Sequence, residues 1–134
     1  MSFLLREFSS HSCALLFDCI SFNCKGLRDQ KKRLKIFQFL KHKISSQGII
    51  LIQETHSTPS DEDKWKTEWG GDLIFSHGTS NSTGVIIGFS SNFNHNIGKI
   101  TRDKNGRVLS LIFLPTHGAT LSSIFITLTL NLSN

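Results

Sequence analysis

The 134-residue sequence predicts an α/β fold in which a βαβ unit precedes a series of antiparallel strands. Two apolar runs, residues 15–22 and 49–52, flank a segment whose apolar residues recur with helical spacing. Five short runs rich in β-branched and aromatic residues follow, separated by turn signals. The first pattern is typical of two parallel strands joined by a right-handed crossover helix, and the second of an antiparallel meander.

The helix of the βαβ unit has a clear start. Asp29 is a favourable N-cap, because its carboxylate can accept hydrogen bonds from the first backbone N–H groups. From there to about Ser45 the basic residues are expected on the outer face, and the inner face carries Leu34, Phe37, Leu40 and Ile44. Gly48 is expected to end this helix.

A second, shorter helix is expected after the start signals at residues 58–60. Acidic residues at 61–63 occupy its first turn, where their negative charges interact favourably with the positive end of the helix dipole. Trp65 and Trp69 share one face, and the glycine pair at 70–71 ends the element.

The remaining elements are expected to be strands. The β-rich runs are residues 73–75, 85–89, 97–101, 108–114 and 123–130. Asn105-Gly106 between two of these runs is a strong signal for a tight hairpin. The length fits one domain, and residues 1–12 are interpreted as an N-terminal extension of it.

Charge and cysteine content narrow the class of protein. Between residues 25 and 43 there are eight Lys or Arg residues and one acid, which favours a polyanion as partner; the solvated face of a helix is the alternative interpretation.

No signal peptide or membrane anchor is recognised, so we expect an intracellular protein, nuclear or cytoplasmic and not secreted, with no obligate protein partner inferred. The three cysteines, near His11, are expected to be free thiols rather than zinc ligands.

Polar residues follow both strands of the βαβ unit. The first strand ends in Asn23 and the second in Glu54, and the carboxyl ends of parallel strands meet at one edge of a sheet. A carboxylate there can hold a hard divalent ion, and an Asn side chain can bond a phosphate. Lys25 and Arg28 flank the same edge, where they can meet an anionic backbone. By spacing alone, polar strand ends that simply reach water are the simpler interpretation.

Two motifs carry a family resemblance. Residues 21–28 (SFNCKGLR) resemble the WN-x-x-GLR opening of the endonuclease/exonuclease/phosphatase superfamily, and residues 50–56 (ILIQETH) resemble its LLQET signature. Residues 58–71, 76–85 and 106–109 are similar to the endonucleases of LINE-type (non-LTR) retrotransposons in particular. The resemblance runs from about residue 15 to the end of the chain, and residues 13–134 are interpreted as the N-terminal part of such a domain.

The resemblance implies specific roles. Asn23 would contact the phosphate and the metal cluster, and Glu54 would coordinate Mg²⁺ in a hydrolase that nicks target DNA. It also implies a sandwich of two sheets with helices outside. We expect this chain to supply one sheet of that α/β-sandwich and to leave an apolar face uncovered.

The sequence departs from the family at several positions. Lys25 stands where relatives carry Asn or Asp, and Asn131 stands where the family has an active-site Tyr. The later D-x-N and S-D-H motifs have no counterpart in the 134 residues, and neither His117 nor Asp103 occupies a matching position. A positioned base contributes roughly 10²–10⁴-fold to the rate, so we expect a truncated domain without nuclease activity of its own.

Two alternatives remain open at this point. One is a phosphatase of the same superfamily that acts on a substrate other than nucleic acid. The other is a non-catalytic basic module that binds nucleic acid.

Overall fold

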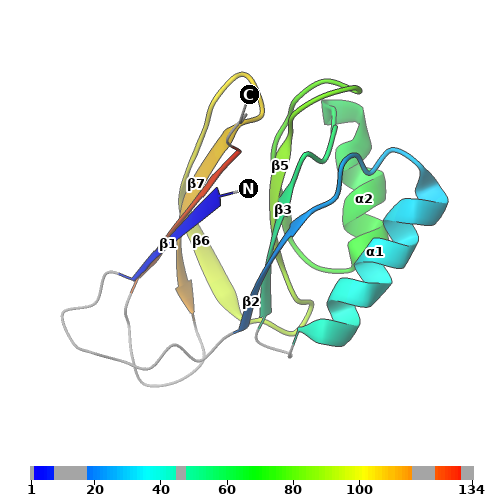
Figure 1. The fold of residues 1–134 in the computed structure, drawn as a ribbon. Helices are drawn as coiled ribbons and strands as arrows, with labels where there is room; N and C mark the ends of the chain where they lie inside the picture. Colours follow the sequence, from blue (N-terminus) through cyan, green and yellow to red (C-terminus); the bar gives the residue numbers. More distant parts are fainter. Residues whose placement is uncertain (1, 8–17, 45–47, 116–122, 131–134) are drawn as a thin grey trace.

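The structure, a computed structural model, describes residues 2–7, 18–44, 48–115 and 123–130. Its elements form two four-stranded sheets and one helical layer (Figure 1). In chain order they are β1 (Ser2–Glu7), β2 (Asp18–Asn23), α1 (Gln30–Lys43), β3 (Gly48–Gln53), the 3₁₀ turn η1 (Pro59–Asp61), α2 (Glu62–Trp69), β4 (Leu73–Ser76), β5 (Val85–Phe89), β6 (His95–Arg102), β7 (Val108–Pro115) and β8 (Ile124–Thr129).

The predicted βαβ unit is confirmed. β2 and β3 are parallel neighbours in a sheet of order β2-β3-β5-β4, and α1 connects them on the outer face of that sheet. The part of the first apolar run before Asp18 lies outside the described residues. β3 is buried along its whole length, as a strand covered on both faces should be.

The antiparallel strands are confirmed as elements, but their expected arrangement as one meander is wrong. β4 and β5 join the first sheet, where β5 lies between β3 and β4. β6, β7 and β8 form a second sheet, and β1 adds to its edge by antiparallel pairing with β8. Residues 2–7, interpreted from the sequence as part of an extension, therefore form an edge strand of the second sheet.

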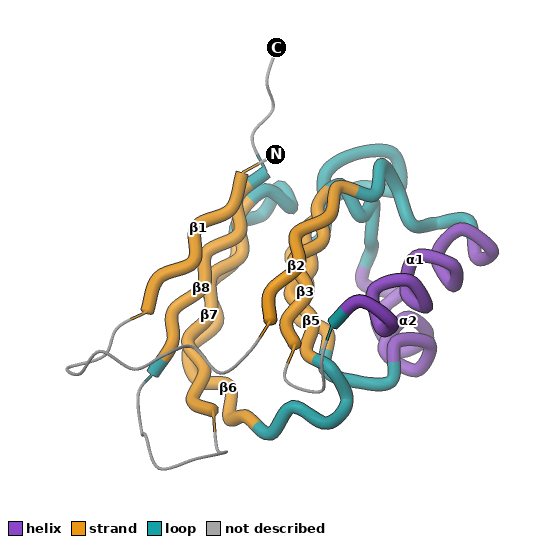
Figure 2. Tube along the Cα trace, turned by 60° about the horizontal axis from the view of Figure 1, so that its bottom comes forward, coloured by secondary structure: helices purple, strands orange, loops and turns teal. Residues whose placement is uncertain are grey.

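The expectation of an uncovered apolar sheet face is also wrong. The two sheets pack face to face, with α1 and α2 on one side of the pair only (Figures 1 and 2). Residues of both sheets form a single buried cluster, which includes Ile49, Leu51, Ile87 and Phe89 of the first sheet and Leu109, Leu111, Phe113, Ile126 and Leu128 of the second. The structure thus shows a mixed α/β fold with two sheets.

The start of α1 is as predicted, and three of the four residues expected on its inner face, Phe37, Leu40 and Ile44, are buried. Asp29 caps the helix and accepts from the Lys32 N–H at 3.0 Å. Leu34, expected in the core, is 42% exposed, whereas the basic residue Arg33 is only 2% exposed. Gly48 does not end the helix, because the cap is Ile44 and Gly48 begins β3.

α2 follows its sequence signals closely. Thr58 forms a capping box at the start of the η1–α2 segment, and Gly70 closes α2 in the left-handed conformation at φ 86°. Trp65 and Trp69 are both buried, and the Trp69 Nε1–H donates to the Phe89 carbonyl at 2.7 Å. Of the helices in the described part of the chain, none combines the length and apolar character needed to cross a membrane.

The hairpin predicted from Asn105-Gly106 is confirmed between β6 and β7. Its loop spans residues 103–107 rather than two residues, and Gly106 supplies a positive φ of 69°. The Asp103 carboxylate holds the loop by accepting from the N–H groups of Arg107 and Val108, both at 3.0 Å.

Candidate active-site rim

The carboxyl ends of β2 and β3 lie side by side, as the sequence predicted. Asn23 is in register with Gln53, so Glu54 is the next residue beyond the paired strands. The two loops continue to pair past the strand ends: Gly26 N–H donates to the Glu54 carbonyl at 2.6 Å, and Leu27 N–H donates to the Thr55 carbonyl at 3.0 Å. We call residues 23–28, 54–57 and 83–84 the rim.

Backbone conformations with positive φ are concentrated at the rim. Among the described residues, the four non-glycine residues with positive φ all lie here: Lys25 (51°), Glu54 (55°), His56 (56°) and Thr83 (57°). A left-handed conformation costs such residues roughly 1–2 kcal/mol each. Backbone hydrogen bonds hold it, including His56 N–H to the Thr83 carbonyl at 2.8 Å. Strain that the surrounding structure maintains is typical of functional sites.

Asn23 and Glu54 are both half-buried at this edge. The Asn23 Oδ1 accepts from the Lys25 N–H at 3.1 Å, which orients the amide. In the described part of the chain no hydrogen bond joins the two side chains to each other. The fold therefore brings the two residues to one edge as neighbours, each available to a third group.

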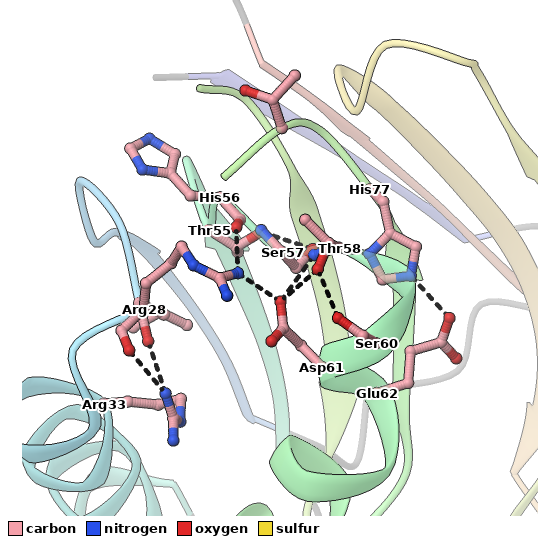
Figure 3. A network of polar contacts seen from close by, with 12 residues as sticks. Arg28, Arg33, Thr55, His56, Ser57, Thr58, Ser60, Asp61, Glu62 and His77 are labelled. Carbon is pink, nitrogen blue, oxygen red and sulfur yellow. Dashed lines mark hydrogen bonds and ion pairs between the residues drawn. The ribbon is translucent and has the colours of Figure 1, made fainter. Parts of the chain in front are cut away.

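Lys25 and Arg28 differ in how free they are. Lys25 is exposed, and its carbonyl accepts from the Lys32 Nζ at 3.1 Å. The Arg28 guanidinium is 42% exposed but forms an ion pair with Asp61 at 2.6 Å and donates to the His56 carbonyl at 3.3 Å (Figure 3). Arg28 thus ties the rim to the start of α2 while part of its surface still faces solvent.

The same contacts stabilise the charged form of Asp61. Partial burial acts to raise the pKa of this carboxyl, but hydrogen bonds from Thr58 and Arg28 outweigh it and leave the pKa below the ordinary value. Asp61 is therefore ionised at neutral pH, and its carboxylate holds the Arg28 side chain in place.

His56 is a rim residue to which the sequence analysis assigned no role. Its ring lies against Gly26, where an added Cβ would be 2.8 Å from Nδ1. Burial lowers the pKa of His56, opposed by the Glu54 carboxylate and aided by Lys32 and Arg28. The imidazole is therefore neutral at pH 7. The signal available in the sequence was its place directly after Glu-Thr in the second motif.

A chain of polar side chains connects the rim to α2, also undetected in the sequence. The Ser57 Oγ lies 2.9 Å from the His77 Nδ1, and the His77 Nε2 lies 2.7 Å from a Glu62 oxygen (Figure 3). The Thr55 hydroxyl donates to Ser57 at 3.2 Å. Ser57 has no solvent exposure, so this arrangement is a structural tie and not a nucleophile open to substrate.

Cys24 also supports the rim. Its thiol lies 3.2 Å from the carbonyls of both Gln53 and Glu54, and burial raises its pKa to about 12. Burial also raises the pKa of Cys19, to about 11. Both are free thiols held protonated; Cys13 and His11 lie outside the described residues.

The rim offers a limited donor set for a divalent cation. The described residues contain no cluster of three His, Cys, Asp or Glu side chains able to hold a metal ion. The Glu54 carboxylate fits a Mg²⁺ ion that retains water and takes further ligands from a substrate phosphate, whereas the Asn23 Oδ1 already accepts from the Lys25 N–H. One carboxylate does not make a complete site of protein ligands.

Comparison with known proteins adds one similarity. No family model matches the sequence. The chain is 34% identical over 89 residues, 66% of its length, to a protein of Xenopus laevis described as the transposon TX1 uncharacterized 149 kDa protein. The matched region spans 7% of that protein. The chain is thus similar to a short segment of a transposon protein.

Proposed function

We propose that the rim is part of a Mg²⁺-dependent phosphodiesterase site of the endonuclease/exonuclease/phosphatase type, as used by retrotransposon endonucleases to nick DNA. The observation that carries the proposal is the strained rim itself, with Asn23 and Glu54 on neighbouring parallel strand ends and left-handed backbone at Lys25 and Glu54. The similarity to a transposon protein and the two face-to-face sheets support it.

Each rim residue then has a chemical task. The side-chain oxygen of Asn23, Oδ1, accepts from the Lys25 N–H, which leaves the side-chain NH₂ group to donate to a phosphate oxygen. The Glu54 carboxylate is the group that would hold the ion, which when bound neutralises charge on the phosphate. The neutral His56 imidazole adds no charge beside Glu54 and so does not compete for it.

DNA is the substrate that the charge distribution favours. Eight Lys or Arg residues lie between positions 25 and 43, and Lys25 and Arg28 stand at the rim itself. Cations so arranged attract a polyanionic backbone by counterion release. A small phosphorylated substrate would need only the few charges immediately at the rim.

The test measures binding of a fluorescent DNA duplex by anisotropy, in Mg²⁺ and in EDTA at matched ionic strength. We expect Mg²⁺ to strengthen binding to the wild type relative to Glu54→Gln, because only the wild type can share the ion with a phosphate. Asp63→Asn is the matched control, since it removes an exposed carboxylate of α2 that is not among the rim residues. Screening by Mg²⁺ is common to all three proteins and cancels in the comparison.

The possible outcomes distinguish a metal-dependent site from a non-catalytic nucleic-acid-binding module. An equal response to Mg²⁺ in wild type and Glu54→Gln would remove Glu54 from the metal site. DNA binding that is salt-dependent but insensitive to both Mg²⁺ and Glu54 would support a non-catalytic nucleic-acid-binding module. The observation that favours this second candidate is that the described residues supply a single rim carboxylate.

Cleavage is a separate question from binding. These 134 residues are expected to nick plasmid DNA no faster than a blank, because the resemblance assigns the general base to later motifs that have no counterpart among them, and such a base contributes roughly 10²–10⁴-fold. Mg²⁺-dependent nicking that Glu54→Ala abolishes would show this expectation to be wrong.

A further inference from the structure

The solvent side of α1 carries a cationic and aromatic surface that the rim does not use. Arg33, Phe37 and Leu40 face inward, so the opposite side of the helix points to solvent. We call this surface the outer α1 face; its exposed members are Lys31, Lys35, Gln38, Phe39 and His42.

Phe39 is the unusual member of this face. It is 48% exposed, and an exposed phenylalanine ring on a helix is seldom needed for folding. The ring is nonetheless held in place, since the Phe22 ring of β2 lies 6.4 Å away and the Lys43 Nζ lies 5.7 Å from its centroid. The Lys43 ammonium thus lies over the ring, while almost half of the Phe39 surface remains exposed to solvent.

The ring borders a shallow hollow in the surface. Lys35, Gln38, Phe39 and His42 line it, with a volume of about 310 Å³. A planar group of the size of a nucleobase can lie in such a hollow against the ring, while Gln38 offers both donor and acceptor atoms. Single-stranded nucleic acids bind proteins through this combination of aromatic stacking and nearby cations.

The charges around the hollow are unneutralised. Within the described residues, neither Lys31 nor Lys35 forms an ion pair with an acidic side chain. The 14 residues of α1 contain six Lys or Arg and no acid, and one of the six, Arg33, is buried. Of the remaining five, Lys31 and Lys35 lie on the outer α1 face, about 6 Å apart along the helix axis.

We propose that the outer α1 face binds single-stranded nucleic acid, with a base stacked on Phe39 and phosphates beside Lys31 and Lys35. Base stacking requires an unpaired base, so a duplex would gain only the phosphate contacts. The proposal does not depend on the rim, because neither Asn23 nor Glu54 takes part in it.

The experiment titrates fluorescein-labelled (dT)₁₅ and a 15-base-pair duplex into the whole chain over a range of salt concentrations. We expect tighter binding of (dT)₁₅ than of the duplex. Phe39→Leu keeps apolar bulk and removes the ring, so (dT)₁₅ affinity should fall about 5- to 100-fold with an unchanged salt slope. Lys35→Gln should reduce the slope of log K against log salt by about 0.7.

Lys99→Gln is the matched charge control, because it removes the same charge from β6, in the other sheet, and should leave (dT)₁₅ binding unchanged. Phe39→Leu should in turn leave the Mg²⁺-dependent part of duplex binding unchanged, so a failure at the rim and a failure at α1 remain distinguishable. If Phe39→Leu weakens duplex and (dT)₁₅ binding equally, the ring does not stack on an unpaired base and the α1 proposal is wrong.

Three further outcomes would overturn the proposal: an unaltered affinity in Phe39→Leu, equal losses in Lys35→Gln and Lys99→Gln, or equal binding of duplex and single strand. If Phe39→Leu does not fold, the changes in amide chemical shifts of the wild type on adding (dT)₁₅ locate the binding surface instead. Shifts confined to residues 31–43 support the proposal, and shifts confined to the rim refute it.

Discussion

Replacing Arg33 with Met is expected to lower the free energy of unfolding by about 3 kcal/mol. The Arg33 side chain is nearly inaccessible and donates to both oxygens of Glu68, from Nε at 2.6 Å and from Nη2 at 2.9 Å. Its Nη1 donates to the carbonyls of Leu27 at 3.0 Å and Arg28 at 3.2 Å. Arg33 therefore joins α1, α2 and the rim loop.

The magnitude follows from what the substitution leaves behind. Met preserves most of the packing against the Trp65 ring, over which the Arg33 guanidinium lies at 5.1 Å. It leaves the Glu68 carboxylate without its partner, and removing one partner of a buried pair costs about 3–5 kcal/mol. The Glu68 side chain is 12% exposed and keeps some hydration, which favours the lower value. The melting temperature should fall by roughly 10–15 °C.

Urea denaturation followed by tryptophan fluorescence measures this, because both tryptophans are buried. The set comprises Arg33→Met, Glu68→Gln, their double variant, and Lys35→Met as an exposed control on the same helix. We expect a coupling energy of at least about 1 kcal/mol between Arg33 and Glu68. Additive single losses, or a loss of under about 1 kcal/mol for Arg33→Met, would refute the structural role given to this pair.

Three further results are expected. First, the hydrogen bonds from Arg33 hold the pKa of Glu68 below its ordinary value of 4.5. The contribution of Glu68 to stability is therefore present above pH 4.5 and is lost as pH falls through the folded pKa. On acidification, the urea midpoint of Glu68→Gln should drop less than that of the wild type. Second, Gly84→Ala should destabilise by about 2 kcal/mol or more, because φ is 92° and the new Cβ would meet a rim hydroxyl. Gly98→Ala, where φ is not positive and the new Cβ would lie 3.3 Å from a carbonyl oxygen, should lower the melting temperature less. Third, Leu111→Ala, between the sheets, should cost about 2–5 kcal/mol, whereas the exposed Leu34→Ala should cost about 0.5 kcal/mol or less; equal costs would argue against the two-sheet core.

The local elements could be predicted from the sequence because their signals are local. The Asp29 cap, the Thr58 start and the Gly70 end each act within one helical turn, and the structure confirms all three. The meeting of Asn23 and the residue before Glu54 could also be predicted, because two parallel strands joined by one helix must end at the same edge. The functional roles of the rim residues stay predictions.

Periodicity predicted the burial of Phe37, Leu40 and Ile44 on α1, but it could not predict the burial of Arg33. Leu34 and Arg33 differ by one position, or 100° around the helix, and the apolar pattern favoured Leu34. The structure buries Arg33 instead, because Glu68 on α2 and two rim carbonyls satisfy its guanidinium. No pattern within α1 contains that partner, which lies 35 residues further along the chain.

The sequence by itself therefore determined where α1, α2 and the strands β2 to β8 lie and which two strand ends form the rim, because caps, turn residues and apolar runs act between near neighbours. Only the tertiary structure decided that residues 2–7 form the strand β1, that β4 and β5 join the first sheet, that β1 and β6–β8 cover it with a second, and that the rim backbone is left-handed. These features depend on hydrogen bonds and packing between segments far apart in the chain. Which segments pair depends on how the apolar faces of both sheets pack in the core, and no local sequence pattern contains that information.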